Sequence, residues 1–217
     1  MADAADRQEL LTALTTEHFT LQGARTQTMS ESASRTTLYI GAVSSALIAL
    51  GFIGQVSDVG DSFKIFALAV LPTVYLLGAF TFIRLVECGA EDFRYGVAIN
   101  RIRGYYRQLA GDQANLFLLS GHDDGRGVFE NMGVPAEGRS QFFSFATVVA
   151  IINSVVGGSA IAIAAGALGA PLGAAAAIGG VVAIASVLGW LRLAARLLTE
   201  RTGGIEPMFP SHRDEAR

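Results

Sequence analysis

Two long stretches of the chain carry almost no charge, and they alternate with segments of ordinary polar composition. Residues 142–191 contain no Asp, Glu, Lys or Arg. Residues 36–83 contain three charged side chains, Asp58, Asp61 and Lys64, all near one short connector. A helix needs about 20 apolar residues to cross a bilayer, and a water-soluble core of this size needs no charge-free run that long. The pattern therefore predicts a membrane protein.

The apolar stretches divide into four predicted transmembrane helices. Their ranges are 36–56, 63–83, 142–168 and 172–193, each of 21 residues or more. The connectors SDVGDS and GAPLG leave room only for tight antiparallel turns. We therefore expect an all-α fold, an integral membrane four-helix bundle of two transmembrane hairpins, residues 36–83 and 142–193, with cytoplasmic helical extensions.

Three polar segments complete the chain: 1–35, 84–141 and 194–217. Residues 4–35 contain no Pro and one Gly, and their leucines recur at helical spacing. This segment is expected to be an amphipathic helix that runs on into the first span. A second helix is expected over 87–109, with its end at Gly111. After residue 200 Gly and Pro interrupt the chain, which predicts a flexible tail.

Fourteen of the 16 basic residues lie in these polar segments, and Arg192 lies at the end of the fourth predicted span, next to the C-terminal segment. Lys64 alone lies near the opposite ends of the spans. Because Lys and Arg are enriched in cytoplasmic loops, this distribution predicts that both termini and the central segment are cytoplasmic. The start of the chain is acidic and polar, so no cleaved signal peptide is expected and the first span is expected to remain.

Composition and motifs narrow the classes of function. A net charge of −3 argues against a basic nucleic-acid binder, and a single cysteine argues against a disulfide scaffold. No nucleophile–base pattern, phosphate-binding loop or dinucleotide fingerprint is present, so neither an enzyme nor a cofactor is expected. His122, Asp123 and Asp124 form the only metal-like cluster. Adjacent residues rarely converge on one ion, so we expect a surface turn there and no metal.

Four arginines follow the second predicted span: Arg94, Arg101, Arg103 and Arg107. With three nearby tyrosines they could bind a phosphate-bearing ligand, because Arg binds phosphate through two parallel hydrogen bonds. The alternative is contact between a membrane-proximal helix and anionic lipid, with nearby Glu and Asp residues neutralising the arginines. We favour the lipid contact because the arginines fall on two faces of the helix.

Small residues set the last two predicted spans apart, since residues 142–191 contain 14 Ala and 8 Gly. Small side chains let helices approach closely in lipid, so tight packing within the bundle is the favoured interpretation. A self-association face or a pore wall is the alternative. The candidate residues for helix packing or pore lining are Asn153, Gly157, Gly158 and Gly180. No ionisable side chain lies at bilayer depth, which argues against proton relays and ion-coupled carriers.

Three stretches, TEHFTLQGARTQTMSES (16–32), AINRIRGYY (98–106) and LLSGHDDGRG (118–127), resemble a group of uncharacterised bacterial, actinobacterial-type, four-span membrane proteins. This resemblance covers most of the chain but implies no activity and no functional residues. In layout alone, the chain is also similar to transmembrane effectors of the SLATT and Pycsar types, which belong to nucleotide-triggered anti-phage systems. That similarity implies oligomeric helices that damage the inner membrane when they are activated.

Two classes of function follow. The favoured one is a non-enzymatic, multi-pass protein of the bacterial inner membrane, a homo-oligomer that acts as an interaction or structural module. Its expected partners are membrane lipids and a cytoplasmic protein or a nucleotide, and no nucleic acid. The alternative is a nucleotide-triggered effector of a bacterial defence system that forms a pore or disrupts the membrane.

Overall fold

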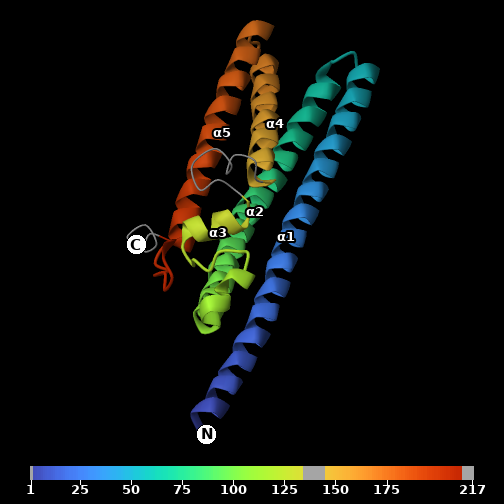
Figure 1. Ribbon diagram of the computed structural model, residues 1–217. Coiled ribbons are helices and arrows are strands. Elements are labelled where there is room, and N and C mark those ends of the chain that lie inside the picture. Colours follow the sequence, from blue (N-terminus) through green and yellow to red (C-terminus); the bar gives the residue numbers. More distant parts are fainter. Residues whose placement is uncertain (1, 134–144, 212–217) are drawn as a thin grey trace. The chain divides into compact units, whose positions relative to one another are not determined.

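The computed structural model describes residues 2–133 and 145–211, and within these ranges the chain is helical and contains no strand (Figure 1). The helices are α1 (Ala2–Val56), α2 (Asp61–Ala110), the 3-10 helix η1 (Gly111–Leu116), α3 (Gly125–Asn131), α4 (Phe145–Ala167) and α5 (Leu172–Thr202). The expectation of an all-α fold is confirmed.

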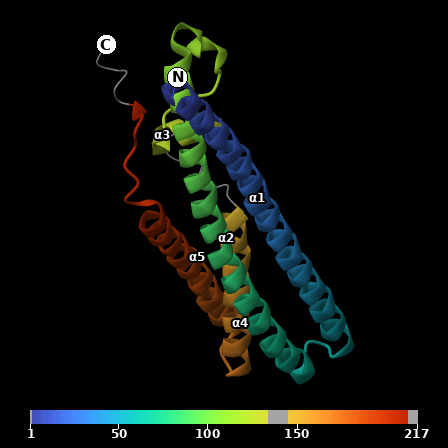
Figure 2. The same ribbon diagram turned by 90° about the horizontal axis from the view of Figure 1, so that it is seen from below.

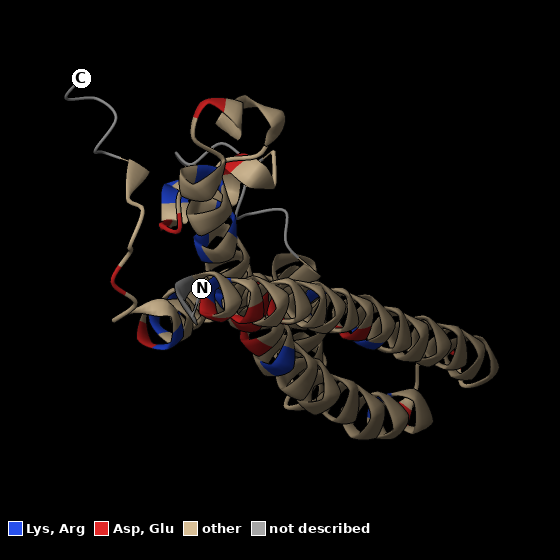
Figure 3. Ribbon diagram, turned by 60° about the horizontal axis from the view of Figure 1, so that its bottom comes forward, with Lys and Arg blue, Asp and Glu red and all other residues tan. Residues whose placement is uncertain are grey.

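Four of these helices, α1, α2, α4 and α5, are long and apolar enough to cross a membrane. Figure 3 shows long tan stretches of helix between the groups of charged residues. By length and composition these helices indicate a membrane protein.

The first two long helices run through the boundaries between apolar and polar sequence. α1 has 55 residues and joins the amphipathic segment to the first predicted span without a break, as expected. α2 has 50 residues, so the second span and the helix expected over 87–109 are one element. Pro72 lies inside α2 without ending it. Gly111, with a φ of 54°, follows the last residue of α2, which confirms the predicted end.

The chain divides into two compact units, each assembled from segments that are distant in sequence. Unit 1 comprises Met1–Glu31, Cys88–Gln141 and Glu200–Arg217. Unit 2 comprises Ser32–Glu87 and Phe142–Thr199.

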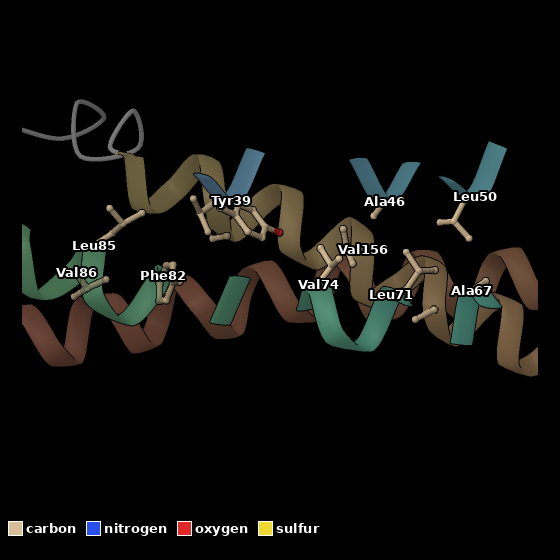
Figure 4. Packing of buried hydrophobic residues seen from close by; sticks show 13 residues of the cluster. Tyr39, Ala46, Leu50, Ala67, Leu71, Val74, Phe82, Leu85, Val86 and Val156 are labelled. Atoms are coloured by element: carbon tan, nitrogen blue, oxygen red, sulfur yellow. The ribbon is translucent and has the colours of Figure 1, made fainter. Parts of the chain in front are cut away.

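The hydrophobic core of unit 2 is built from all four long helices. Tyr39 of α1, Phe82 of α2 and Val149 of α4 are at most 1% exposed. Figure 4 shows Val74 of α2 pointing toward Val156 of α4. α5 contributes an aromatic contact, because the ring of Trp190 packs on that of Phe82 with centroids 4.8 Å apart.

The outer faces of the same helices are also apolar. Leu47 and Phe52 of α1 are 58% and 65% exposed, and Phe80 of α2 is 71% exposed. A soluble monomer rarely shows so much large apolar surface, whereas lipid chains would cover it. This pattern agrees with a membrane protein.

The end of the chain differs from the sequence-based expectation. α5 continues past residue 193 to Thr202, because no helix-breaking residue occurs before Gly203 and because Leu197 and Leu198 pack against the core of unit 2. Gly204 then turns the chain with a φ of 83°. The following residues, expected to be a flexible tail, are hydrogen bonded within unit 1 as far as Ser211.

Candidate functional site

A buried carboxylate lies at the centre of unit 1. The side chain of Asp123 is fully buried, and Arg101 of α2 donates a hydrogen bond from Nε to its Oδ2 over 2.6 Å. A buried charge is stable only when it is paired and its oxygens receive hydrogen bonds. Arg101 supplies the opposite charge, and main-chain N–H groups supply the remaining bonds.

These N–H groups belong to residues 205–211, a segment that we call the strap. Met208 donates to Oδ2 of Asp123 over 3.0 Å and Phe209 donates to Oδ1 over 2.7 Å. The N–H of Asp123 in turn donates to the carbonyl oxygen of Phe209. Arg101 completes the contact, since its Nη2 donates to the carbonyl oxygen of Glu206 over 2.6 Å.

The neighbouring carboxylate, Asp124, serves two elements at once. Its Oδ1 accepts from the N–H of Gly127 over 2.8 Å and so caps the N-terminus of α3. Its Oδ2 accepts from both the N–H and the Oγ of Ser211, each over 2.7 Å. Burial raises the pKa of Asp124, but the hydrogen bonds from Ser211 and Gly127 outweigh it, and the net effect is a lowered pKa.

Two glycines make room for the strap. A Cβ on Gly104 of α2 would lie 2.5 Å from the ring of Phe209 and 2.8 Å from the carbonyl oxygen of Gly121. A Cβ on Gly121 would lie 2.8 Å from the Cα of Gly104. Any larger residue at either position would force the loop or the ring away from α2. We call Gly104, Gly121, Asp123 and Asp124 the cradle.

The loop that carries the cradle is held in place by side-chain amides. Asn131 of α3 donates to the carbonyl oxygen of Ser120 and accepts from its N–H, both over 2.8 Å. Asn100 of α2 donates to the carbonyl oxygen of His122 over 2.8 Å. The shape of the loop therefore depends on contacts that do not involve the strap.

Two of the other candidate arginines fix the same loop. Arg103 donates to Oδ1 of Asn100 over 2.8 Å and to the carbonyl oxygen of Ser120 over 3.2 Å. Arg107 donates to the carbonyl oxygen of Phe117 over 2.7 Å. Thus Arg101 on one face of α2, and Arg103 and Arg107 on the other, all donate to acceptors within the chain.

Arg94 differs from the other three arginines. Its side chain is exposed and makes no hydrogen bond or ion pair within the described residues. Asp92, which the sequence suggested as a neutralising neighbour, instead pairs with Arg25 of α1 through two hydrogen bonds of 2.7 and 3.2 Å. Contact of the four arginines with an anionic ligand or with lipid stays a prediction.

An apolar groove of about 550 Å³ lies within unit 1, between α1, α2 and the strap. Its lining is Leu10, Leu14, Glu17 and Leu21 of α1, Arg94, Val97, Ala98, Arg101, Ile102 and Tyr105 of α2, and Ile205, Met208 and Phe209 of the strap. This volume is typical of binding sites, and so is a mostly apolar lining with a few polar groups. The strap therefore has two roles, as it fills the cradle and forms one wall of the groove.

In unit 2 the intramembrane candidate Asn153 is completely buried on α4. Tyr39 of α1 donates its hydroxyl hydrogen to Oδ1 of Asn153 over 3.1 Å. The Nδ2 of Asn153 has no hydrogen-bond partner within the described residues. Gly78 of α2 lies directly against the Asn153 amide, so that this side chain touches two further helices.

The three candidate glycines have different surroundings. A Cβ on Gly158 would lie 2.5 Å from the carbonyl oxygen of Gly179, where α4 and α5 run side by side (Figures 1 and 2). Gly157 faces the ring of Tyr75 of α2, with a Cβ distance of 2.8 Å. Gly180 faces open space, with no atom within 4 Å of a Cβ built there. Thus Gly157 and Gly158 mark close helix contacts, and Gly180 lies on an outer surface.

The interpretation of His122, Asp123 and Asp124 as a surface turn is wrong for Asp123, which is 1% exposed. The neighbouring residues alone predict a surface turn, because two aspartates lie between glycines. The partners that bury Asp123, Arg101 and the strap, are 22 and about 85 positions away along the chain. The sequence contained one weak indication of the strap, because Pro207 and Pro210 flank Met208 and Phe209, the two residues whose N–H groups donate to Asp123.

The described residues thus define a helical protein with four helices that are long and apolar enough to cross a membrane. In its unit 1 the strap lies in a cradle that contains two carboxylates. Comparison with protein-family models, with curated proteins and with solved structures gave no match.

Proposed function

We propose that the protein is a non-enzymatic integral membrane protein that acts as an interaction module, with unit 1 as its docking surface. The groove between α1, α2 and the strap is the observation that carries this proposal. It is open at the surface, as Leu10 and Met208 in its lining are 47% and 61% exposed. Leu10, Leu14 and Leu21 of α1 line the groove and suit the apolar face of an amphipathic helix, which we propose as the docked element of a partner protein.

The proposed topology has two transmembrane hairpins in the bacterial inner membrane. The apolar outer faces of α1 and α2 support insertion. The distribution of basic residues supports cytoplasmic termini and a cytoplasmic central segment, since 14 of the 16 lie in these parts, Arg192 lies next to the C-terminal one and only Lys64 lies near the opposite ends of the spans. Membrane lipids are then the immediate partners, and lateral contact through the small-residue helices α4 and α5 would form a homo-oligomer.

The ionisable groups of unit 1 support a structural use of its polar chemistry. Asp123 is enclosed by Arg101 and the strap, and Asp124 is divided between a helix cap and Ser211. Arg103 and Arg107 bind carbonyl oxygens of the loop. Because these side chains already form hydrogen bonds that hold the main chain in place, they favour a role in binding a partner over a role in catalysis.

Membrane insertion can be tested by expressing the full chain in a bacterium and extracting the membranes with alkaline carbonate. The protein should stay in the pellet, and a reporter fused to its C-terminus should be active only in the cytoplasm. Release by carbonate, or a periplasmic reporter, would refute the membrane assignment or the orientation.

Docking can be tested with a photo-crosslinking amino acid at Leu14 in the groove, with the same probe at the exposed Gln27 of α1 as the matched control. One partner should be captured through an amphipathic helix, identified by mass spectrometry, from position 14 and not from position 27. Equal labelling at both positions would refute the groove as the docking site. Dye leakage from liposomes on addition of a cyclic nucleotide would instead support the effector alternative.

A further inference from the structure

The strap has no regular strand structure and bends at Met208 and Phe209, and it is bound to the cradle mainly through its main chain. Three of its N–H groups, at Met208, Phe209 and Ser211, donate to carboxylate oxygens, and the carbonyl oxygen of Phe209 accepts from Asp123. The ring of Phe209, on Gly104, is the apolar anchor. Recognition therefore depends mainly on main-chain groups with one aromatic side chain.

The prolines of the strap match this hydrogen-bond register. The sequence from 206 is Glu-Pro-Met-Phe-Pro-Ser, so that Pro207 and Pro210 occupy the positions that donate nothing to the cradle. Proline has no N–H and restricts the chain to extended conformations, so it is harmless at these two positions and lowers the entropy lost on binding. All three residues of the strap that carry an N–H after Pro207, namely Met208, Phe209 and Ser211, donate it to a carboxylate of the cradle.

We propose that the cradle is a peptide-binding site and that its occupant can come from a second copy of the chain, so that exchanged straps link neighbouring copies. This rests on the proposed function in one respect, namely that copies meet in a membrane. Nothing in the contacts distinguishes a strap in the same copy from one in another, because both present identical N–H groups and the same ring.

The cradle is expected to keep its shape when the strap leaves. Asn131 and Asn100 hold the loop on both sides of Gly121 without any contact to the strap. Departure of the strap would remove two main-chain N–H donors from Asp123 and leave its ion pair with Arg101. An incoming strap would restore the lost hydrogen bonds.

The connection to α5 permits exchange. α5 ends at Thr202, and Gly203 and Gly204 join it to the strap. Gly204 has a φ of 83°, which only glycine adopts at little cost, so a change of direction here requires little strain. Exchange of an identical segment is a common route to oligomers, and confinement to one membrane raises the effective concentration of neighbouring cradles.

The first experiment measures binding of the peptide in detergent, and so does not depend on membrane insertion or on a docked partner. A fluorescein-labelled peptide of residues 205–211 is titrated against the full chain and against a chain that ends at Gly204. We expect saturable binding to the shortened chain and about tenfold weaker binding to the full chain, whose cradle is filled. No saturable binding to a shortened chain of native helicity, or equal binding to both chains, would overturn the proposal.

Matched variants test the register. A peptide with Met208→Pro loses one donor to Asp123, whereas Glu206→Ala in the peptide leaves every N–H in place. The first should bind at least tenfold more weakly and the second nearly unchanged. If the shortened chain does not fold, the full chain with Phe209→Ala replaces it, because this chain is complete but lacks the aromatic anchor. Equal binding of the two peptides would overturn the recognition of main-chain donors.

The second experiment tests exchange between copies in the membrane. One full chain carries Asp123→Asn and a photo-crosslinking amino acid at the exposed Met208, and a second, differently tagged full chain carries a normal cradle. We expect crosslinks from the first copy to the second, and their loss when the second copy also carries Asp123→Asn. Crosslinks confined to single copies, or independent of Asp123 in the second copy, would overturn strap exchange.

Discussion

Gly78 of α2 touches the amide of Asn153 of α4 so closely that no side chain fits between them. A Cβ at position 78 would overlap Oδ1 of Asn153 and lie 2.8 Å from the ring of Tyr39. The hydrogen bond from Tyr39 to the same Oδ1 joins α1 to this contact. Three of the helices of unit 2 therefore meet at one hydrogen-bonded point, and its tolerance to added volume is small.

We predict that Gly78→Ala destabilises unit 2 by about 1–3 kcal/mol, the usual effect of overpacking a tight core. Gly41→Ala in α1 is the matched control, because a Cβ there meets no atom within 4 Å. Thermal unfolding of the purified protein in detergent, followed by circular dichroism, measures both. A double variant with Asn153→Ala should recover part of the loss. Equal stability of the Gly78 and Gly41 variants would contradict the contact.

A second prediction concerns the buried charge in unit 1. Asp123→Asn removes the charge that pairs with Arg101 and one of the two strong acceptors for the strap. Because the side chain of Arg101 is 36% exposed, water offsets part of the loss, and we expect destabilisation by about 1–3 kcal/mol. Limited proteolysis should then cut between residues 203 and 211. The exposed Asp112→Asn is the control and should leave cleavage and melting unchanged.

Much of the fold could be predicted from the sequence because its signals are local. Charge-free runs mark the long apolar helices, a segment almost without helix breakers predicts the continuity of α1, and Gly111 marks the end of α2. The strap and the burial of Asp123 could not be predicted in this way. Both depend on hydrogen bonds across 85 or more positions, while the local signals of Gly, Pro and Asp describe a surface loop.

The arginines illustrate the same division. Their separation onto two faces of α2 was visible in the sequence, but the acceptors on each face were not. Arg101 meets a carboxylate and a strap carbonyl, whereas Arg107 meets the carbonyl oxygen of Phe117. Every residue has a main-chain carbonyl oxygen, so no pattern of residue types predicts which of these oxygens will accept a hydrogen bond from an arginine.

The third prediction follows from the lowered pKa of Asp124. A carboxyl whose pKa is lower in the folded state stabilises it at pH values above the unfolded pKa, about 3.9, and loses this effect as the pH falls through the folded pKa. Docking of the strap should thus be constant from pH 8 to about pH 5 and weaken only below about pH 4. The amide NMR signals of Gly127 and Ser211 report it. A midpoint above pH 5 would contradict the prediction, and Asp124→Asn should remove the titration.

The last prediction separates packing inside one chain from assembly of copies. Gly158 lies against the carbonyl oxygen of Gly179, so Gly158→Leu should separate α4 from α5 and lower the melting temperature in detergent. Gly180 faces open space in the same pair of helices, so Gly180→Leu should leave melting nearly unchanged and act only on contacts between copies. Light scattering in detergent would then show a smaller assembly for Gly180→Leu. An unchanged mass would refute self-association through this face, and a large drop in melting temperature would show that position 180 is packed within the chain.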